Sequence, residues 1–238
     1  KKSRNHTELM LQNCTNNIKV DENKITIVPN PSVNIESIEV PGDPSSAAFF
    51  IVAGLINKNS ELQIKNICLN ETRIHFISIL KKMGADIEII NSKINAGEEI
   101  GDVIVKSSKL KSVNIQESSI PLLIDEIPIL SLACALAEGK SEILNAEELR
   151  FKESDRIKTI VSELKKLGSD IQETNNGIII LGKDSLEGAE CESHHDHRIA
   201  MMIAVAGTVA RGTTSIRNPQ CASVSFPNFY NELNNFRK

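Results

Sequence analysis

Three segments that are apolar on almost every side constrain the fold of this chain more than any other feature. They cover residues 44–57, 126–138 and 197–210. A helix with this composition is buried all round rather than on one face. Each segment is also shorter than the roughly 20 residues that are needed to cross a bilayer. We therefore expect a fold built around three buried helices.

A second kind of helical segment alternates with the apolar ones. Residues 4–18, 73–87 and 156–171 resemble one another and carry apolar residues at helical spacing. KKMGADI and KKLGSDI, 84 residues apart in the last two, match at five of seven positions. Gly84 and Gly168 are placed where a glycine ends a helix. Strand-like sequences follow both glycines, and in the second case a turn at Asn175-Asn176-Gly177 leads to a further strand.

The order of these segments is buried helix, strand, amphipathic helix, strand, strand, and it recurs about every 70 to 85 residues. This period is too long for the common solenoid repeats. It predicts an α/β fold (α+β in strict usage) of three βαβαββ-like units whose buried helices lie parallel and side by side. Residues 1–37 hold only the second half of a unit, so we expect them to be the tail of a different domain. A linker is expected to start at Pro29-Asn30-Pro31, and residues 38–238 are expected to form one domain.

Composition excludes several classes of protein. Only 3% of the 238 residues are aromatic and none is Trp, so the core must be aliphatic. The net charge is −4 and the basic residues are scattered, which argues against a nucleic-acid partner. Five dispersed cysteines without a CxxC pair indicate a reducing compartment, and with no signal peptide or long apolar run we expect a cytoplasmic protein without a membrane partner. The chain begins Lys1-Lys2 rather than with Met, so we expect a fragment of a longer protein.

An aspartate precedes each apolar segment: Asp43, Asp125 and Asp196. Such aspartates can cap the exposed N–H groups of a helix. If the three helices are parallel, their positive N-terminal ends converge on one surface and would attract phosphate or carboxylate. Capping alone also explains the three residues.

The densest polar cluster is Lys152-Glu153-Ser154-Asp155-Arg156, which opens the third amphipathic helix. We expect Ser154 to be the N-cap. Arg156 offers a bidentate clamp to an oxyanion, and Lys152 beside Glu153 can share a proton. Taken alone, however, the pentapeptide is more typical of a solvated, charged helix start than of a binding site.

The string His194-His195-Asp196-His197-Arg198 could bind a metal. However, adjacent residues on a helix point in different directions, and the HxxxH spacing is absent. We therefore expect no metal site here and favour His197 and Arg198 at an anion site. Cys134, inside an apolar segment, is expected to be a core residue rather than a nucleophile.

Five motifs together resemble those of the 5-enolpyruvylshikimate-3-phosphate synthase (3-phosphoshikimate 1-carboxyvinyltransferase) family. They stand in the family's order: VPGDPSSAAFFIVAGLI, LIDEIPILSLACALAEG, LRFKESDRI, DHRIAMMIAVAG and SFPNF. The resemblance runs from Ser3 to Phe236. It implies the enolpyruvyl transferase-like fold, in which two domains of three βαβαββ units close on the substrates. It also implies that this chain is the C-terminal portion and that its partner is the missing N-terminal half of the same enzyme.

The resemblance implies transfer of the enolpyruvyl group of phosphoenolpyruvate to the 5-hydroxyl of shikimate 3-phosphate, with release of phosphate and without a metal or organic cofactor. Asp125 matches the residue that accepts the hydroxyl proton, and Lys152 and Glu153 match the pair that moves protons at the enolpyruvyl methylene. The residues that match substrate contacts are Ser3, Asp125, Lys152, Arg156, His197 and Arg198. Such an enzyme would act in chorismate and aromatic amino acid biosynthesis, and we expect a monomer at full length.

Two positions depart from the family pattern. Glu148 stands where some members have an Asn that contacts the shikimate phosphate, and Val224 stands where some have a lysine for phosphoenolpyruvate. Two alternatives remain open. One is a UDP-N-acetylglucosamine enolpyruvyl transferase, although the FKESDRI and DHRIAM strings favour the shikimate enzyme. The other is a non-catalytic anion-binding or metal-binding module that uses the 194–198 string.

Overall fold

The computed structural model describes residues 3–21, 24–29, 32–34 and 37–236. Most of these residues belong to two repeats that share one order of helices and strands. The first repeat consists of α2 (Pro44–Ile56), β3 (Glu61–Cys68), α3 (His75–Lys82), β4 (Asp86–Asn95) and β5 (Glu98–Lys106). The second consists of β6 (Asn114–Ile115), η1 (Glu117–Ser119), α4 (Ile120–Leu123), α5 (Ile127–Ala135), β7 (Lys140–Ile143), η2 (Glu147–Phe151), α6 (Arg156–Lys166), β8 (Asp170–Thr174) and β9 (Gly177–Leu181).

The sheets of the two repeats share one topology. The first sheet has the order β3-β5-β4 with antiparallel neighbours. The second has the order β6-β7-β9-β8, in which β7, β9 and β8 reproduce the first arrangement and β6 adds a parallel edge strand. The repeat expected from the sequence is therefore confirmed at the level of strand order.

The third unit is shorter than the expected pattern. It consists of β10 (Glu190–Glu192), α7 (His197–Ala206) and β11 (Ser215–Arg217), with β10 and β11 paired in parallel. The chain then continues as η3 (Pro219–Val224) and α8 (Phe229–Phe236) instead of an amphipathic helix and two strands. Phe229 of α8 packs edge-on against Phe49 of α2, so this last helix covers the core.

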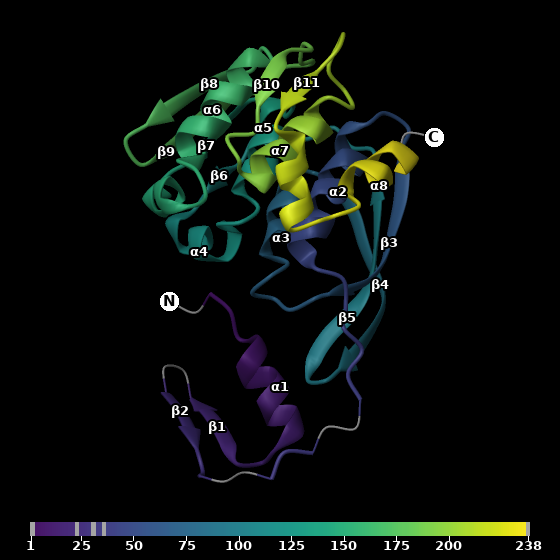
Figure 1. The fold of residues 1–238 in the computed structure, drawn as a ribbon, viewed down its shortest axis with the longest axis vertical. Coiled ribbons are helices and arrows are strands. Elements are labelled where there is room, and N and C mark those ends of the chain that lie inside the picture. Colours follow the sequence, from purple (N-terminus) through teal and green to yellow (C-terminus); the bar gives the residue numbers. More distant parts are fainter. Residues whose placement is uncertain (1–2, 22–23, 30–31, 35–36, 237–238) are drawn as a thin grey trace.

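The three buried helices α2, α5 and α7 lie side by side and parallel (Figure 1). At their N-terminal ends, Ser45 Oγ donates to Glu126 Oε1 at 2.5 Å. Next to it, Arg198 Nη1 donates to the Asp125 carbonyl oxygen at 3.2 Å. At the opposite ends, Asn57 Nδ2 donates to Thr208 Oγ1 at 2.8 Å. Contacts at both ends confirm the parallel arrangement, and every residue of α5 is buried.

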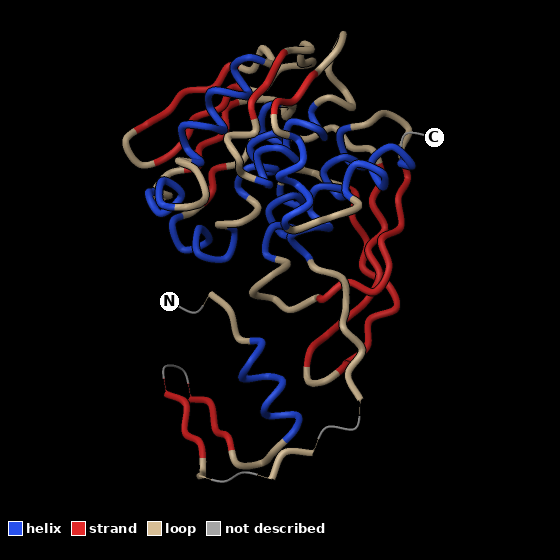
Figure 2. The backbone as a smooth tube through the Cα atoms, viewed as in Figure 1, coloured by secondary structure: helices blue, strands red, loops and turns tan. Residues whose placement is uncertain are grey.

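Strands lie along the edges of the main body, with helices between them (Figure 2). The buried helices α2 and α5 contact the strands β3 and β9 directly, and the amphipathic helix α6 packs on both α5 and β8. Gly84 and Gly168 follow α3 and α6 with φ of 92° and 83°, a left-handed conformation that glycine adopts at no steric cost. The predicted helix ends are therefore confirmed. The apolar positions of α6 face the core, as the spacing indicates.

The N-terminal residues form a separate strip at the bottom of Figure 1. It contains α1 (His6–Cys14) and the antiparallel pair β1 (Ile18–Asp21) and β2 (Lys24–Ile27). Ile25, Ile27 and Val28 of this strip are exposed. Lys1, Lys2 and the expected linker residues Asn30 and Pro31 lie outside the described residues.

Among the described residues, no single helix is both long and apolar enough to cross a bilayer. The segments Glu117–Leu123 and Ile127–Ala135 pass that test together on length and composition, but the chain bends by 116° between them.

Candidate active site

The N-terminal ends of the three buried helices meet at one surface, and their aspartates play different roles there. Asp43 Oδ2 accepts from the Ser46 amide at 2.8 Å, and Asp196 Oδ1 accepts from the Arg198 amide at 2.9 Å. These two residues cap α2 and α7 as expected. Asp125 does not cap α5, because the N-cap position is occupied by Glu126 and no side-chain cap bond is made. Asp125 lies at the bend between α4 and α5, where its carboxylate is turned toward the neighbouring arginines.

Three arginines from different parts of the chain surround the Asp125 carboxylate. Arg4 Nη2 lies 3.4 Å from Oδ2, and Oδ1 lies 3.7 Å from Arg156 Nη1 and 3.6 Å from Arg198 Nη2. The side chain of Asp125 remains 28% exposed. The arrangement places a carboxylate that solvent can reach inside a cluster of fixed positive charges.

Arg156 is buried and is held by two further carboxylates. Its Nε donates to Asp196 Oδ2 at 2.8 Å, and its Nη2 donates to Asp196 Oδ1 at 3.3 Å and to Glu153 Oε2 at 2.6 Å. Among the described residues, Arg156 Nη1 and Arg198 Nε are buried without a hydrogen-bond acceptor. Buried N–H groups are almost always hydrogen-bonded, so these two point to an anionic ligand.

Asp196 carries its charge because of this arrangement. Burial by itself would raise the pKa of Asp196, but the hydrogen bonds and charge of Arg156, with the Arg198 amide and Ser154, hold that pKa below its usual value. Ser154 Oγ donates to Asp196 Oδ2 at 3.0 Å, and the N-cap of α6 is Asp155, whose Oδ1 accepts from the Lys158 amide at 3.1 Å. The prediction of Ser154 as N-cap is wrong because its hydroxyl is drawn to the buried carboxylate of the neighbouring unit.

His197 and Glu153 stand at the edge of the arginine cluster. His197 Nδ1 lies 3.9 Å from Glu153 Oε1. Burial lowers the pKa of His197, and the charge of Arg198 lowers it further. His197 therefore favours its neutral form, in which one ring nitrogen donates and the other accepts.

Lys152 and Ser3 line a neighbouring cavity of about 490 Å³ together with Arg4 and Glu148. Since Arg4 also contacts Asp125, the cavity adjoins the arginine cluster. The structure thus brings Asp125, Glu153, Arg156, His197 and Arg198 into direct contact, and it places Lys152 and Ser3 beside them. Val224, at the end of η3, is 82% exposed.

Four polar residues of this surface were not singled out as site residues in the sequence. They are Arg4, Ser45, Arg73 and Glu126. Arg73 Nη2 donates to Asp43 Oδ1 at 2.6 Å and to Ser45 Oγ at 3.0 Å, and Ser45 in turn donates to Glu126. Burial raises the pKa of Glu126, which is 1% exposed. The sequence does carry a signal for Glu126, because it is a carboxyl side chain directly after Asp125 in an otherwise apolar segment.

The 194–198 string is held by hydrogen bonds within the chain. His194 Nε2 lies 2.8 Å from Glu163 Oε1, and the Glu192 amide donates to Glu163 Oε2 at 2.8 Å. His194 and His195 both adopt left-handed backbone conformations, with φ of 55° and 57°. Among the described residues, the cluster of potential metal ligands is elsewhere and is discussed below. Cys134 is fully buried and burial raises its pKa to about 11, which confirms it as a core residue.

Comparison with known proteins shows the family of the chain. Residues 1–233 match the family model for EPSP synthase (3-phosphoshikimate 1-carboxyvinyltransferase). Proteins named 3-phosphoshikimate 1-carboxyvinyltransferase are 49% identical over 96% of this chain in Thermoanaerobacter sp. (strain X514) and 51% identical over 96% in Petrotoga mobilis. These matches cover 54% and 53% of the two relatives, so the chain spans about half the length of the curated relatives it matches.

A solved structure agrees with the sequence match. The EPSP synthase of Acinetobacter baumannii superposes with a TM-score of 0.93 at 42% identity, over 99% of this chain and 54% of the other. The fold class is therefore confirmed as that of these enzymes. The chain that carries this arginine cluster is therefore a member of the EPSP synthase family.

Proposed function

We propose that the chain is the C-terminal portion of an enzyme that transfers the enolpyruvyl group of phosphoenolpyruvate to the 5-hydroxyl of shikimate 3-phosphate and releases phosphate. The observation that carries the proposal is the cluster in which Arg4, Arg156 and Arg198 surround Asp125. Residues 38–238 form the domain that supplies Asp125, Arg156 and Arg198, and residues 1–37, which supply Arg4, end the other domain. At full length the enzyme is a cytoplasmic monomer of chorismate and aromatic amino acid biosynthesis.

In this proposal Arg156 and Arg198 bind the phosphate and carboxylate of phosphoenolpyruvate. Each has a buried N–H without an acceptor among the described residues, and guanidinium groups bind such anions with paired hydrogen bonds. Asp196 fixes the Arg156 guanidinium in place through two of its nitrogens. Because these cations are fixed before the substrate arrives, they stabilise negative charge without reorganisation. Ser3 lies in the adjoining cavity, where it would face the shikimate phosphate.

The reaction needs one base at the hydroxyl and one acid at the methylene. Asp125 accepts the proton of the 5-hydroxyl while the hydroxyl oxygen adds to C2 of phosphoenolpyruvate. Lys152 and Glu153 deliver a proton to the C3 methylene, which becomes a methyl group. In the second step the C2–O bond to phosphate breaks, a methyl proton returns to the same pair, and the leaving phosphate takes the proton that Asp125 had accepted. Each step is a proton transfer or a change at a C–O bond, so the proposal requires no cofactor.

The test restores the missing half of the site in a chimera. The segment that precedes the match is taken from the Thermoanaerobacter relative, and phosphate release is measured with phosphoenolpyruvate and shikimate 3-phosphate. We expect release that requires both substrates. We also expect it to fall in Arg156→Lys but not in Arg217→Lys, since Arg217 is exposed and pairs with Glu190.

Two outcomes would contradict the proposal. A folded chimera that releases phosphate with UDP-N-acetylglucosamine in place of shikimate 3-phosphate would assign the other enolpyruvyl transferase activity. A folded chimera that binds phosphoenolpyruvate but converts neither acceptor would favour the alternative of a non-catalytic anion-binding module.

A further inference from the structure

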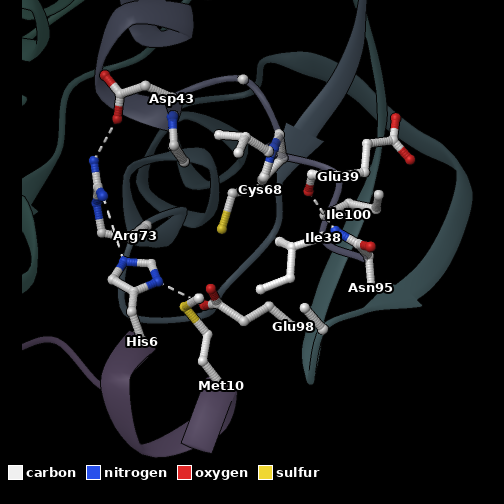
Figure 3. A pocket seen from close by; sticks show the side chains of 15 residues that line it. His6, Met10, Ile38, Glu39, Asp43, Cys68, Arg73, Asn95, Glu98 and Ile100 are labelled. Atoms are coloured by element: carbon white, nitrogen blue, oxygen red, sulfur yellow. Dashed lines mark hydrogen bonds and ion pairs between the residues drawn. The ribbon is translucent and has the colours of Figure 1, made fainter. Parts of the chain in front are cut away.

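A second cavity, of about 300 Å³, lies where the N-terminal strip meets the first repeat (Figure 3). His6 and Met10 reach it from α1, Cys68 from the end of β3 and Glu98 from the start of β5. Arg73 forms part of its wall. Neither Asp125 nor Lys152 lines it, so it is distinct from the cavity at the candidate active site.

Three potential metal ligands point toward one another in this cavity. A ring nitrogen of His6, Sγ of Cys68 and a carboxylate oxygen of Glu98 all lie within 4.8 Å of one another. One nitrogen, one sulfur and one oxygen ligand form a set that Zn²⁺ accepts in tetrahedral coordination, with a water molecule in the fourth position. We propose that His6, Cys68 and Glu98 form a binding site for zinc or a similar divalent metal, which ties α1 to the sheet of the first repeat.

The surroundings of Glu98 support a metal ligand at this position. His6 Nδ1 lies 2.6 Å from Glu98 Oε1, and Asn70 Nδ2 donates to the same oxygen at 2.6 Å. Asn70 is itself fixed, because its Oδ1 accepts from the Thr72 amide at 2.9 Å. The bonds from His6 and Asn70 both end on Oε1 of Glu98. Oε2 of Glu98 is therefore the oxygen that can turn to a metal. The bond from Asn70 belongs to the second layer of hydrogen bonds that orients metal-binding carboxylates in proteins, whereas the bond from His6 is replaced when a metal takes Nδ1.

Arg73 opposes metal binding in a way that can be measured. Its Nη1 lies 3.4 Å from His6 Nε2, and because a guanidinium only donates, it favours the tautomer with the proton on Nδ1. A metal on Nδ1 moves that proton to Nε2, where it faces the Arg73 N–H groups. Arg73→Gln replaces this donor with an amide oxygen that can accept from Nε2. We therefore expect Arg73→Gln to bind the metal more tightly than the wild-type protein.

The experiment is titration of the protein with ZnCl₂ by calorimetry and with CoCl₂ by absorption spectroscopy. We expect one site in the wild-type protein. His6→Ala, Cys68→Ser and Glu98→Gln should each weaken binding by about 10- to 100-fold or more, because even second-layer changes have effects of that size. Cobalt should show the near-ultraviolet charge-transfer band of a thiolate ligand, and the band should be lost in Cys68→Ser.

Matched controls remove the same groups elsewhere in the chain. His194→Ala and Cys221→Ser should leave the affinity unchanged. Zinc affinity that survives His6→Ala but is lost in His194→Ala would move the metal to the 194–198 string and overturn the proposal. A wild-type cobalt complex without the thiolate band would also overturn it, whether or not the substituted proteins fold.

Discussion

Arg156 is almost completely buried, yet one nitrogen of its guanidinium has no hydrogen-bond acceptor among the described residues. The side chain is 1% exposed and lies against the carboxylates of Asp125, Glu153 and Asp196. A buried charge is costly unless it is paired and hydrogen-bonded, and Asp196 supplies most of that compensation through two nitrogens. The remaining nitrogen, Nη1, makes no hydrogen bond among the described residues and lies 3.7 Å from Asp125 Oδ1. Burial and function are compatible here because the guanidinium has more donors than one carboxylate can use.

The first prediction concerns the proposed acid and base. In the full-length enzyme, Asp125→Ala and Lys152→Ala should each lower kcat by roughly 10²-fold or more, because positioned proton-transfer groups contribute about that much. Steady-state kinetics with both substrates measures the effect. Asp184→Ala and Lys158→Ala are the matched controls, since both side chains are exposed. A change confined to KM would make Asp125 and Lys152 binding residues instead.

The second prediction follows from His197. Burial and Arg198 lower its pKa in the folded protein, whereas the unfolded chain has the ordinary value near 6.5. As the pH falls below about 6.5 the unfolded state therefore takes up the proton first, and the free energy of unfolding decreases. His197→Gln should flatten this dependence. Urea unfolding from pH 8 to pH 5 checks it, and equal slopes in both proteins would contradict it.

Periodicity in the sequence predicts the helices and their ends, but it does not predict polar contacts between distant segments. The apolar segments and the glycines that follow α3 and α6 predict helices and helix ends, because both are local properties. The cap of α6 was misassigned because Ser154 and Asp155 have similar intrinsic preference for that position, and the choice depends on Asp196 from another unit. Arg4 and Asp125 are 121 residues apart, so no local spacing could have paired them.

The third prediction concerns the loop that leads into α7. His195 is exposed and has a φ of 57°, a conformation that costs a residue with a Cβ about 1 kcal/mol or more. His195→Gly should therefore be about 1 kcal/mol more stable than His195→Ala. Comparing two substitutions at one position cancels the loss of the imidazole. Urea unfolding of the pair decides the matter, and an alanine variant as stable as the glycine variant would show that the loop relaxes.

The same loop gives a fourth prediction. Glu163 is buried and binds His194 Nε2, the Glu192 amide and Lys166. Glu163→Gln keeps the shape of the side chain but removes its charge, and it should lower the free energy of unfolding by about 1–3 kcal/mol. Glu187→Gln is the control, because that side chain is exposed. A loss no larger than that of the control would mean that the loop is held by its backbone alone.

The arginine cluster around Asp125 draws its residues from three parts of the chain. Arg4 belongs to the N-terminal strip, Asp125 and Arg156 to the second repeat, and Arg198 to the third unit. The chain also spans about half of its relatives' length. The fifth prediction is that these 238 residues fold but do not convert phosphoenolpyruvate and shikimate 3-phosphate. An unfolding transition by circular dichroism with no phosphate release is the expected result, and measurable enolpyruvyl transfer would refute it.

The convergence of three parallel helices on the surface that we propose to bind anions has a thermodynamic consequence. A ligand held by residues of separate units binds only when all of them are folded, so its binding free energy adds to the stability of the assembled domain and to that of no partly folded form. Local opening of any one unit then forfeits the whole of that free energy. A bound anion should therefore make unfolding more cooperative, because all the repeats that surround it must be folded to hold it.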